Sequence, residues 1–289
     1  MIVRLKPYLE PKLWGNTKLN RRYRHHTDEH IGEAWGISMI THKESVIQDG
    51  DYDGMPFSML YKERPALFGG LEGEFPLLIK VLDAHDDLSI QVHPKEGEEE
   101  KNEAWFVLDA EKDAKLILGH KSESLEIFQT ALKEKRFSEL LLTYDVSKGD
   151  RFFIDAGKLH GIGKGIELFE IQQASDTTYR VYDYDRLVKG KKRPLHLADA
   201  FKVMRFPDDQ VQKKMKNPYF TVEHLILNQE MTLGAHQYGD YLYVIRGKGK
   251  INERTLSAHE FVFVSSHEKY QLKGQLEVLK STILKAKKN

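Results

Sequence analysis

The sequence predicts a mainly β protein, a sandwich or barrel with a helical insertion in its first half. Short β-branched or aromatic segments, separated by Gly, Asp and charged residues, recur along the chain, and this is the pattern of many short strands. In the first half these segments are 76–82, 88–93, 104–109, 114–118, 151–154 and 166–172. From Tyr219 onward the pattern is again β, in the stretches "FTVEHLIL", "YLYVIRGKGKI", "EFVFVSS" and "LEVLKSTIL".

Helical spacing interrupts the β pattern. Residues 123–142 carry apolar side chains at roughly helical intervals, and Ser122 is a candidate N-cap. A second helix is predicted over 195–204, and a weaker helical pattern lies in 56–70. We therefore expect one or two helices inserted into the β structure around 122–142.

The end of the chain echoes its middle. The stretch "GDRFFIDAGKLH", 149–160, aligns with "HEFVFVSSHEKY", 259–270: both have a turn, an aromatic strand, small residues and a closing residue. That closing residue is His160 in the first copy and Tyr270 in the second. The pattern favours a duplicated β unit whose second copy has lost its polar residue.

Composition excludes several function classes. The 289 residues contain 44 Lys and Arg against 44 Asp and Glu, so no overall positive field attracts nucleic acid. No stretch approaches the roughly 20 apolar residues of a membrane span, and the N-terminus lacks the pattern of a secretory signal. We therefore expect a cytoplasmic protein with no membrane or nucleic-acid partner. Because there is no cysteine, any metal must be bound by His, carboxylate or amide groups.

The stretch "LSIQVHP", 88–94, has one polar face. Side chains alternate along a strand, so Ser89, Gln91 and His93 project from the same side. Glu103 comes immediately before the next strand, where hairpin pairing is expected to bring it beside 88–93, and His160 ends its own unit at a rim. Together they form an N/O set that suits zinc, and also iron or manganese. Taken singly, each is more simply a surface residue, a strand end or part of an acidic loop.

A second polar group lies in "LFEIQQASDTTYRVYDYDR", 168–186. Glu170 and Gln172 share a strand face, and Asp176 and Arg180 follow them. Arginine is suited to forked recognition of a phosphate or carboxylate. On the residues alone, however, a surface network of arginines and aspartates is the preferred interpretation. No glycine-rich phosphate loop occurs in the chain.

In order and spacing, the motifs "LWG", "GEAWGIS", "LSIQVHP", "KNEAW", "DAGKLHGIG" and "EIQQASDTTYRVYDYDR" resemble those of type I mannose-6-phosphate isomerases of the short bacterial kind. The resemblance implies two cupin-type jelly-roll β-barrels: a catalytic domain over 1–215 and a C-terminal domain without a metal site over 216–289. It also implies one zinc ion per chain. The implied metal ligands are Gln91, His93, Glu103 and His160.

The same resemblance implies the reaction and further site residues. The reaction interconverts mannose 6-phosphate and fructose 6-phosphate through an enediolate, so the partner is a small sugar phosphate. The implied catalytic residues are Arg180, Glu170 and Lys101, and the implied substrate-binding residues are Ser89, Lys80 and Arg180. The proton-transfer group stays open among Glu170, Lys101 and a histidine. We expect a monomer or a weak homo-oligomer.

Two other functions fit the same residues. One is an oxygenase with iron held by His93, Glu103 and His160. The other is a sugar-binding cupin without catalysis, in which the metal is structural. In either case the C-terminal unit is expected to lack a metal, because His236 has no partner at Tyr270.

Overall fold

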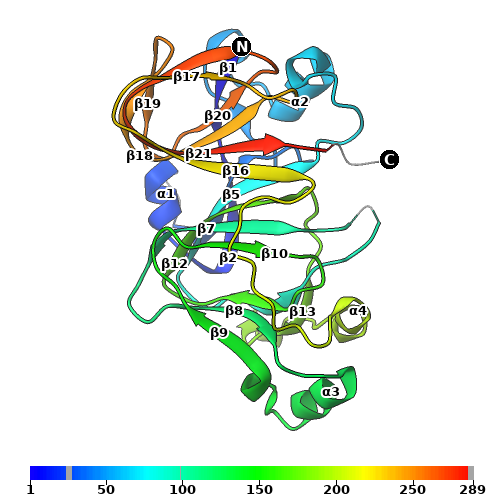
Figure 1. The fold of residues 1–289 in the computed structure, drawn as a ribbon. Helices are drawn as coiled ribbons and strands as arrows, with labels where there is room; N and C mark the ends of the chain where they lie inside the picture. The colour runs from blue at the N-terminus through cyan, green and yellow to red at the C-terminus, as the bar shows by residue number, and fades with distance from the viewer. Residues whose placement is uncertain (24–27, 98, 286–289) are drawn as a thin grey trace.

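The protein consists of three stacked β-sheets with short helices at both ends of the stack and at one side (Figure 1). The computed structural model describes residues 1–23, 28–97 and 99–285. Most of the predicted strands are found within a residue or two of their expected limits, so the prediction of a mainly β protein is confirmed. Among the described residues, no helix has the length and apolar character needed to cross a membrane.

The strands are distributed among the sheets as follows. The eight-stranded sheet contains β1 (Ile2–Lys6), β4 (Val46–Ile47), β16 (Phe220–Leu227), β17 (Met231–Gly234), β18 (Asp240–Ile251), β19 (Arg254–Ser257), β20 (Phe261–Val264) and β21 (Lys269–Ile283). The six-stranded sheet contains β2 (Tyr8–Asn16), β3 (Ile31–Ile37), β5 (Leu77–Ala84), β7 (Glu103–Ala110), β10 (Arg151–Ile154) and β12 (Ile166–Gln173). The five-stranded sheet contains β6 (Ile90–Val92), β8 (Lys115–His120), β9 (Leu141–Asp145), β11 (His160–Ile162) and β13 (Tyr179–Tyr182). A small hairpin pairs β14 (Leu187–Val188) with β15 (Lys191–Lys192).

The six-stranded sheet is the central layer, and both of its faces are buried. On β12, Phe169 and Ile171 belong to an apolar cluster shared with the eight-stranded sheet, whereas Leu168 belongs to a cluster shared with the five-stranded sheet. Because side chains alternate along a strand, Glu170 lies on the side of the five-stranded sheet. The same alternation places Lys80 of β5 and Glu103 of β7 on that side. Polar side chains from three neighbouring strands are therefore directed between the two sheets.

Short helices flank the sheets. They are α1 (Lys18–Tyr23), α2 (Phe57–Glu63), α3 (Leu125–Lys133) and α4 (Leu197–Val203), with 3-10 turns η1 (Gly50–Tyr52), η2 (Pro65–Phe68) and η3 (Phe137–Leu140). Apolar residues of α3, η3 and α4 pack against the outer face of the five-stranded sheet. The cap of α3 corrects the sequence prediction, because the Ser124 hydroxyl, not that of Ser122, accepts from the Ile127 N–H at 3.3 Å.

One expectation about strand pairing needs correction. The hairpin pairing expected for Glu103 is wrong: β7 lies in the six-stranded sheet and β6 in the five-stranded sheet, so Glu103 faces the 88–93 strand across the layer between them. The N-terminal strand β1 pairs with β20, which places the start of the chain in the sheet of the C-terminal strands. Among the described residues, no strand pairing closes any of these sheets into a ring.

Candidate metal and substrate site

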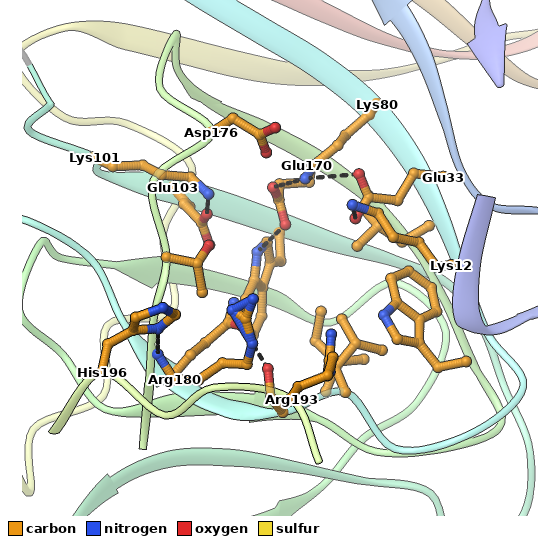
Figure 2. A pocket seen from close by; sticks show the side chains of 18 residues that line it. Lys12, Glu33, Lys80, Lys101, Glu103, Glu170, Asp176, Arg180, Arg193 and His196 are labelled. Carbon is orange, nitrogen blue, oxygen red and sulfur yellow. Dashed lines mark hydrogen bonds and ion pairs between the residues drawn. The ribbon is translucent and has the colours of Figure 1, made fainter. Parts of the chain in front are cut away.

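A cavity of about 410 Å³ opens between the six-stranded and five-stranded sheets (Figure 2). Its lining includes Lys12, Glu33, Lys80, Ser89, Gln91, Lys101, Glu103, Glu170, Asp176, Arg180, Arg193 and His196. In the close view, Lys80, Glu170 and Glu33 lie toward one end and Arg180, Arg193 and His196 toward the other. The cavity therefore has an acid–base end and an arginine end.

Three buried side chains at this cavity could hold a metal ion. The Nε2 atom of His93 lies 3.0 Å from Glu103 Oε1, and Nε2 of His160 lies 3.9 Å from Glu103 Oε2. All three side chains are at most 2% exposed, and their ligand atoms lie within 4.8 Å of one another. Ligands at about 2.0–2.1 Å in a tetrahedron are about 3.3 Å apart, so the observed separations fit such a site.

The histidine hydrogen bonds orient both rings for this role. Nδ1 of His93 lies 3.0 Å from the Thr177 carbonyl oxygen, and Nδ1 of His160 lies 2.9 Å from the Lys158 carbonyl oxygen. A carbonyl can only accept, so each Nδ1 carries the proton and each Nε2 presents its lone pair to Glu103. Within the part of the chain that the structure describes, the buried Nε2 of His93 has no hydrogen-bond partner. Two imidazole nitrogens beside an ionised carboxylate form a donor set that suits a metal cation.

The charge states match those of metal ligands. Burial, followed by repulsion from His93, lowers the pKa of His160 to about 3. Burial and Lys101 also lower the pKa of His93. Burial raises the pKa of Glu103, but Lys101 at 2.9 Å and the two imidazoles outweigh that effect and hold this pKa well below its usual range. Neutral imidazoles and an ionised carboxylate are the forms that bind metal.

The predicted fourth ligand lies beside the other three. Gln91 pairs with His160 in the β6–β11 register, and its amide lies 3.3 Å from His160 Nε2. The Ser89 hydroxyl donates to the Gln91 amide oxygen at 3.1 Å. The two ends of an amide are interchangeable by rotation, so Gln91 can turn its oxygen toward the imidazoles.

At the acid–base end, Lys80 links two buried carboxylates. Its Nζ lies 3.0 Å from Glu170 Oε1 and 3.3 Å from Glu33 Oε2. Burial raises the pKa of Glu170 to about 7, and repulsion from Glu103 adds to this shift. Burial also raises the pKa of Glu33, but Lys12, Lys80 and the Trp35 indole N–H outweigh it and lower this pKa to about 2. One carboxyl can thus exchange a proton near neutral pH while its neighbour stays charged.

At the arginine end, the positive charge of Arg180 has no carboxylate partner among the described residues. Burial, then repulsion from Arg193, lowers the pKa of Arg180. The buried Nε of Arg180 has no hydrogen-bond partner, and no ion pair to its guanidinium is found among the described residues. Arg193 is fixed by Asp183, whose Oδ2 accepts from its Nε at 2.7 Å. His196 Nδ1 accepts from the Arg180 backbone N–H at 3.1 Å. An anionic group fits this end of the cavity.

All the site residues expected from the sequence line this cavity or lie directly behind it. Sequence reasoning missed Lys12, Glu33, Arg193 and His196. Glu33 stands in the "GEAWGIS" motif, so its signal was present but its role was not recognised. Arg193 follows the basic run "KGKK", which by itself is typical of a solvated turn.

Comparison with known proteins agrees with this geometry. The family profile described as phosphomannose isomerase type I, catalytic domain, matches residues 2–127. The mannose-6-phosphate isomerase ManA of Bacillus subtilis is 36% identical over 270 residues, covering 85% of this chain and 86% of the relative. The chain belongs to the type I phosphomannose isomerase family.

Other members of the type I phosphomannose isomerase family match nearly the whole chain. The mannose-6-phosphate isomerase of Streptococcus mutans is 33% identical and covers 96% of both chains. The crystal structure of the mannose 6-phosphate isomerase from Bacillus subtilis has a TM-score of 0.88 at 32% identity and covers 98% of this chain and 99% of its own. A mannose 6-phosphate isomerase structure bound with zinc and yttrium shares the fold at 15% identity, with a TM-score of 0.74 and coverage of 98% and 99%.

Proposed function

We propose that this protein is a metal-dependent aldose–ketose isomerase that interconverts D-mannose 6-phosphate and D-fructose 6-phosphate through an enediolate. Relatives that match this chain over most of their length are named mannose-6-phosphate isomerase. The observation that carries the proposal is the cavity itself, which brings together a candidate metal triad, a proton-exchanging carboxyl and an arginine without an ion pair among the described residues.

The proposed metal is one zinc ion per chain. His93, Glu103, His160 and the Gln91 oxygen would hold it, and this all-N/O set suits zinc. When bound, the ion supplies Lewis-acid polarisation of the substrate oxygens and stabilises the charge of the enediolate. The zinc-bound relative supports this choice of metal.

For proton transfer we favour Glu170. Isomerisation removes a proton from the carbon beside the carbonyl and returns it to the neighbouring carbon, so one group must act as base and then as acid. The Glu170 carboxyl lines the cavity, and its pKa of about 7 suits both roles. Lys80 at 3.0 Å stabilises its ionised form. Lys101 is instead engaged with Glu103, and the candidate histidines His93 and His160 are proposed as ligands.

The arginine end is proposed to take the phosphate, with the developing oxyanion as the alternative. The Arg180 guanidinium offers a forked set of donors, and Arg193 lines the same wall. Ser89, 6% exposed beside Gln91, adds a hydroxyl donor within the cavity. Lys80, at the opposite end, is proposed to orient the sugar hydroxyls. A sugar phosphate spanning the cavity would thus place its reacting carbons near Glu170 and the metal ligands.

A coupled assay tests the reaction and the metal together. Purified protein is given mannose 6-phosphate before chelation, after chelation and after addition of zinc, and fructose 6-phosphate is measured. We expect turnover that vanishes with the chelator and returns with zinc. Turnover that requires oxygen and iron would support the oxygenase alternative, and sugar binding without turnover would support the non-catalytic one.

The remaining architectural expectations are part of the same proposal. We propose two cupin-type jelly-roll units, a catalytic one within 1–215 and a metal-free one within 216–289, with β1 and β4 added to the second unit's sheet. We also propose a cytoplasmic monomer or weak homo-oligomer. Light scattering on the purified chain tests the assembly state, and cell fractionation tests the location.

A further inference from the structure

A buried ion pair lies directly behind His160, outside the cavity. The Lys158 ammonium donates to Asp208 Oδ1 at 2.7 Å, and the Leu159 backbone N–H donates to Asp208 Oδ2 at 2.8 Å. Asp208 is 4% exposed, and Lys158 is 2% exposed. The Asp208 carboxylate is therefore hydrogen-bonded to both residues that immediately precede the candidate metal ligand.

One further hydrogen bond connects these contacts of Asp208 to the His160 imidazole. The carbonyl oxygen of Lys158 accepts from His160 Nδ1 at 2.9 Å, and this bond fixes which ring nitrogen carries the proton. Because Asp208 holds both the Lys158 side chain and the Leu159 N–H, it fixes the peptide that carries this carbonyl. A shift of that peptide would turn the imidazole away from Glu103.

The backbone of Asp208 is itself held by hydrogen bonds to the end of β8. Its backbone exchanges hydrogen bonds with His120 at the end of β8, at 2.8 and 3.2 Å. Gly119 makes this close approach possible: at φ +88°, a Cβ there would lie 1.9 Å from the Asp208 carbonyl oxygen. The Gly119 N–H also donates to the Leu159 carbonyl at 2.6 Å. The turn before His160 is thus hydrogen-bonded both to β8 and to a segment that follows α4.

Stability alone does not account for this arrangement. A buried ion pair is often no more stabilising than apolar residues of similar volume, because both charges lose their hydration. The Asp208 carboxylate instead fixes the orientation of the peptide between Lys158 and Leu159, because it accepts from the Lys158 ammonium and the Leu159 backbone N–H at once. Hydrogen-bonding partners behind a metal ligand typically change metal affinity about 10–100-fold when they are removed.

We propose that Asp208 is a positioning residue that sets the metal affinity of this site through the Lys158 carbonyl and His160. The proposal rests on the metal site proposed above and adds a residue that lies beyond the ligands. It predicts that metal affinity depends on a carboxylate that touches neither metal nor substrate.

The test measures metal binding directly. Zinc affinity is determined by competition with a chromophoric chelator for wild type, Asp208→Asn and Asp208→Ala, and the visible spectrum of the cobalt-loaded proteins reports ligand geometry. We expect Asp208→Ala to bind zinc about 10–100-fold more weakly, with an altered cobalt spectrum, and Asp208→Asn to fall between it and wild type. Unchanged affinity and spectrum in folded Asp208→Ala would overturn the proposal.

Two further variants separate positioning from folding. Glu277→Gln is the matched control, because Glu277 is 6% exposed and paired with His224 at 2.8 Å in β21. We expect it to lower stability without changing zinc affinity. If the single Asp208 variants do not fold, the pair Lys158→Met with Asp208→Leu replaces both charges by apolar groups, and it should fold with weakened zinc binding. Wild-type affinity in that pair would contradict the proposal.

The wild-type titration distinguishes the two levels of the argument. One zinc per wild-type chain, abolished by His93→Ala, supports the metal site whatever the Asp208 variants do. No zinc on wild type would overturn the metal site and the role of Asp208 together.

Discussion

The two strand–turn units whose sequences resemble each other, 149–160 and 259–270, use their interiors in opposite ways. In the first, His160 begins β11, and its Nε2 lies 3.9 Å from Glu103 Oε2 and 3.3 Å from the Gln91 amide. In the second, Tyr270 occupies the corresponding place in β21, and its hydroxyl donates to the fully buried Asp240 at 2.8 Å. The first arrangement brings a histidine nitrogen and a carboxylate together at a cavity, and the second pairs a hydroxyl with a carboxylate inside the core.

The surroundings of the two positions reinforce this contrast. Tyr270 belongs to an apolar cluster of the eight-stranded sheet that includes Val244, Val262 and Leu272. Around His160, by contrast, ionisable side chains line an open cavity. Burying such groups without partners is costly, so the first unit gives up packing stability for a site that can bind and react.

Removing a metal ligand should have the largest effect. We expect His93→Ala to lose zinc and isomerase activity together, with kcat/KM falling at least about a thousandfold, because the metal contributes several kcal/mol of charge stabilisation. Metal analysis and the coupled assay on the same preparation check this result. A variant that keeps full activity without zinc would remove the functional difference between the two units.

Neutralising Glu170 should separate chemistry from metal binding. We expect Glu170→Gln to keep one zinc and to lose about 10²–10⁴-fold in kcat, because the amide cannot exchange a proton. In wild type the base must be ionised, so kcat/KM should fall as the pH drops below the Glu170 pKa, which burial raises toward 7. A Glu170→Gln enzyme that retains wild-type kcat would shift the proton-transfer role to Lys101.

Arg180 should matter less than the metal but more than any surface arginine. We expect Arg180→Ala to keep zinc and to lose about a hundredfold or more in kcat/KM, since one preorganised donor to a developing charge contributes about that much. Arg136→Ala is the control, because that side chain is exposed and pairs only with local glutamates. Full activity in Arg180→Ala, measured over a range of substrate concentrations, would end its assignment.

Alternation along strands explains why so much of the site could be predicted. The period of two was enough to place Ser89, Gln91 and His93 on one face, and the motifs supplied Glu103 and His160. Local patterns do not reveal which sheet a strand joins, so Glu103 was expected beside β6 and instead faces it from the central sheet.

Other features depend on contacts between distant parts of the chain. Arg193 becomes part of the cavity only because Asp183 holds it there, ten positions away. Asp208 lies fifty positions from Lys158, and nothing in the sequence joins the two. Such long-range polar pairs carry no periodic signal, so only the folded structure reveals them.

The smallest effect on activity is expected in the second unit, at the residue that corresponds to His160. Tyr270→Phe removes the hydroxyl that satisfies Asp240 and leaves a buried carboxylate short of one donor, which should lower the free energy of unfolding by about 1–3 kcal/mol. Urea unfolding measures this loss, and the coupled assay with metal analysis should find wild-type turnover and one zinc. Because Asp240 and Tyr270 belong to the eight-stranded sheet and neither lines the cavity, loss of zinc or activity would mean that the second unit supports the site, and the contrast between a reactive and a closed interior would fail.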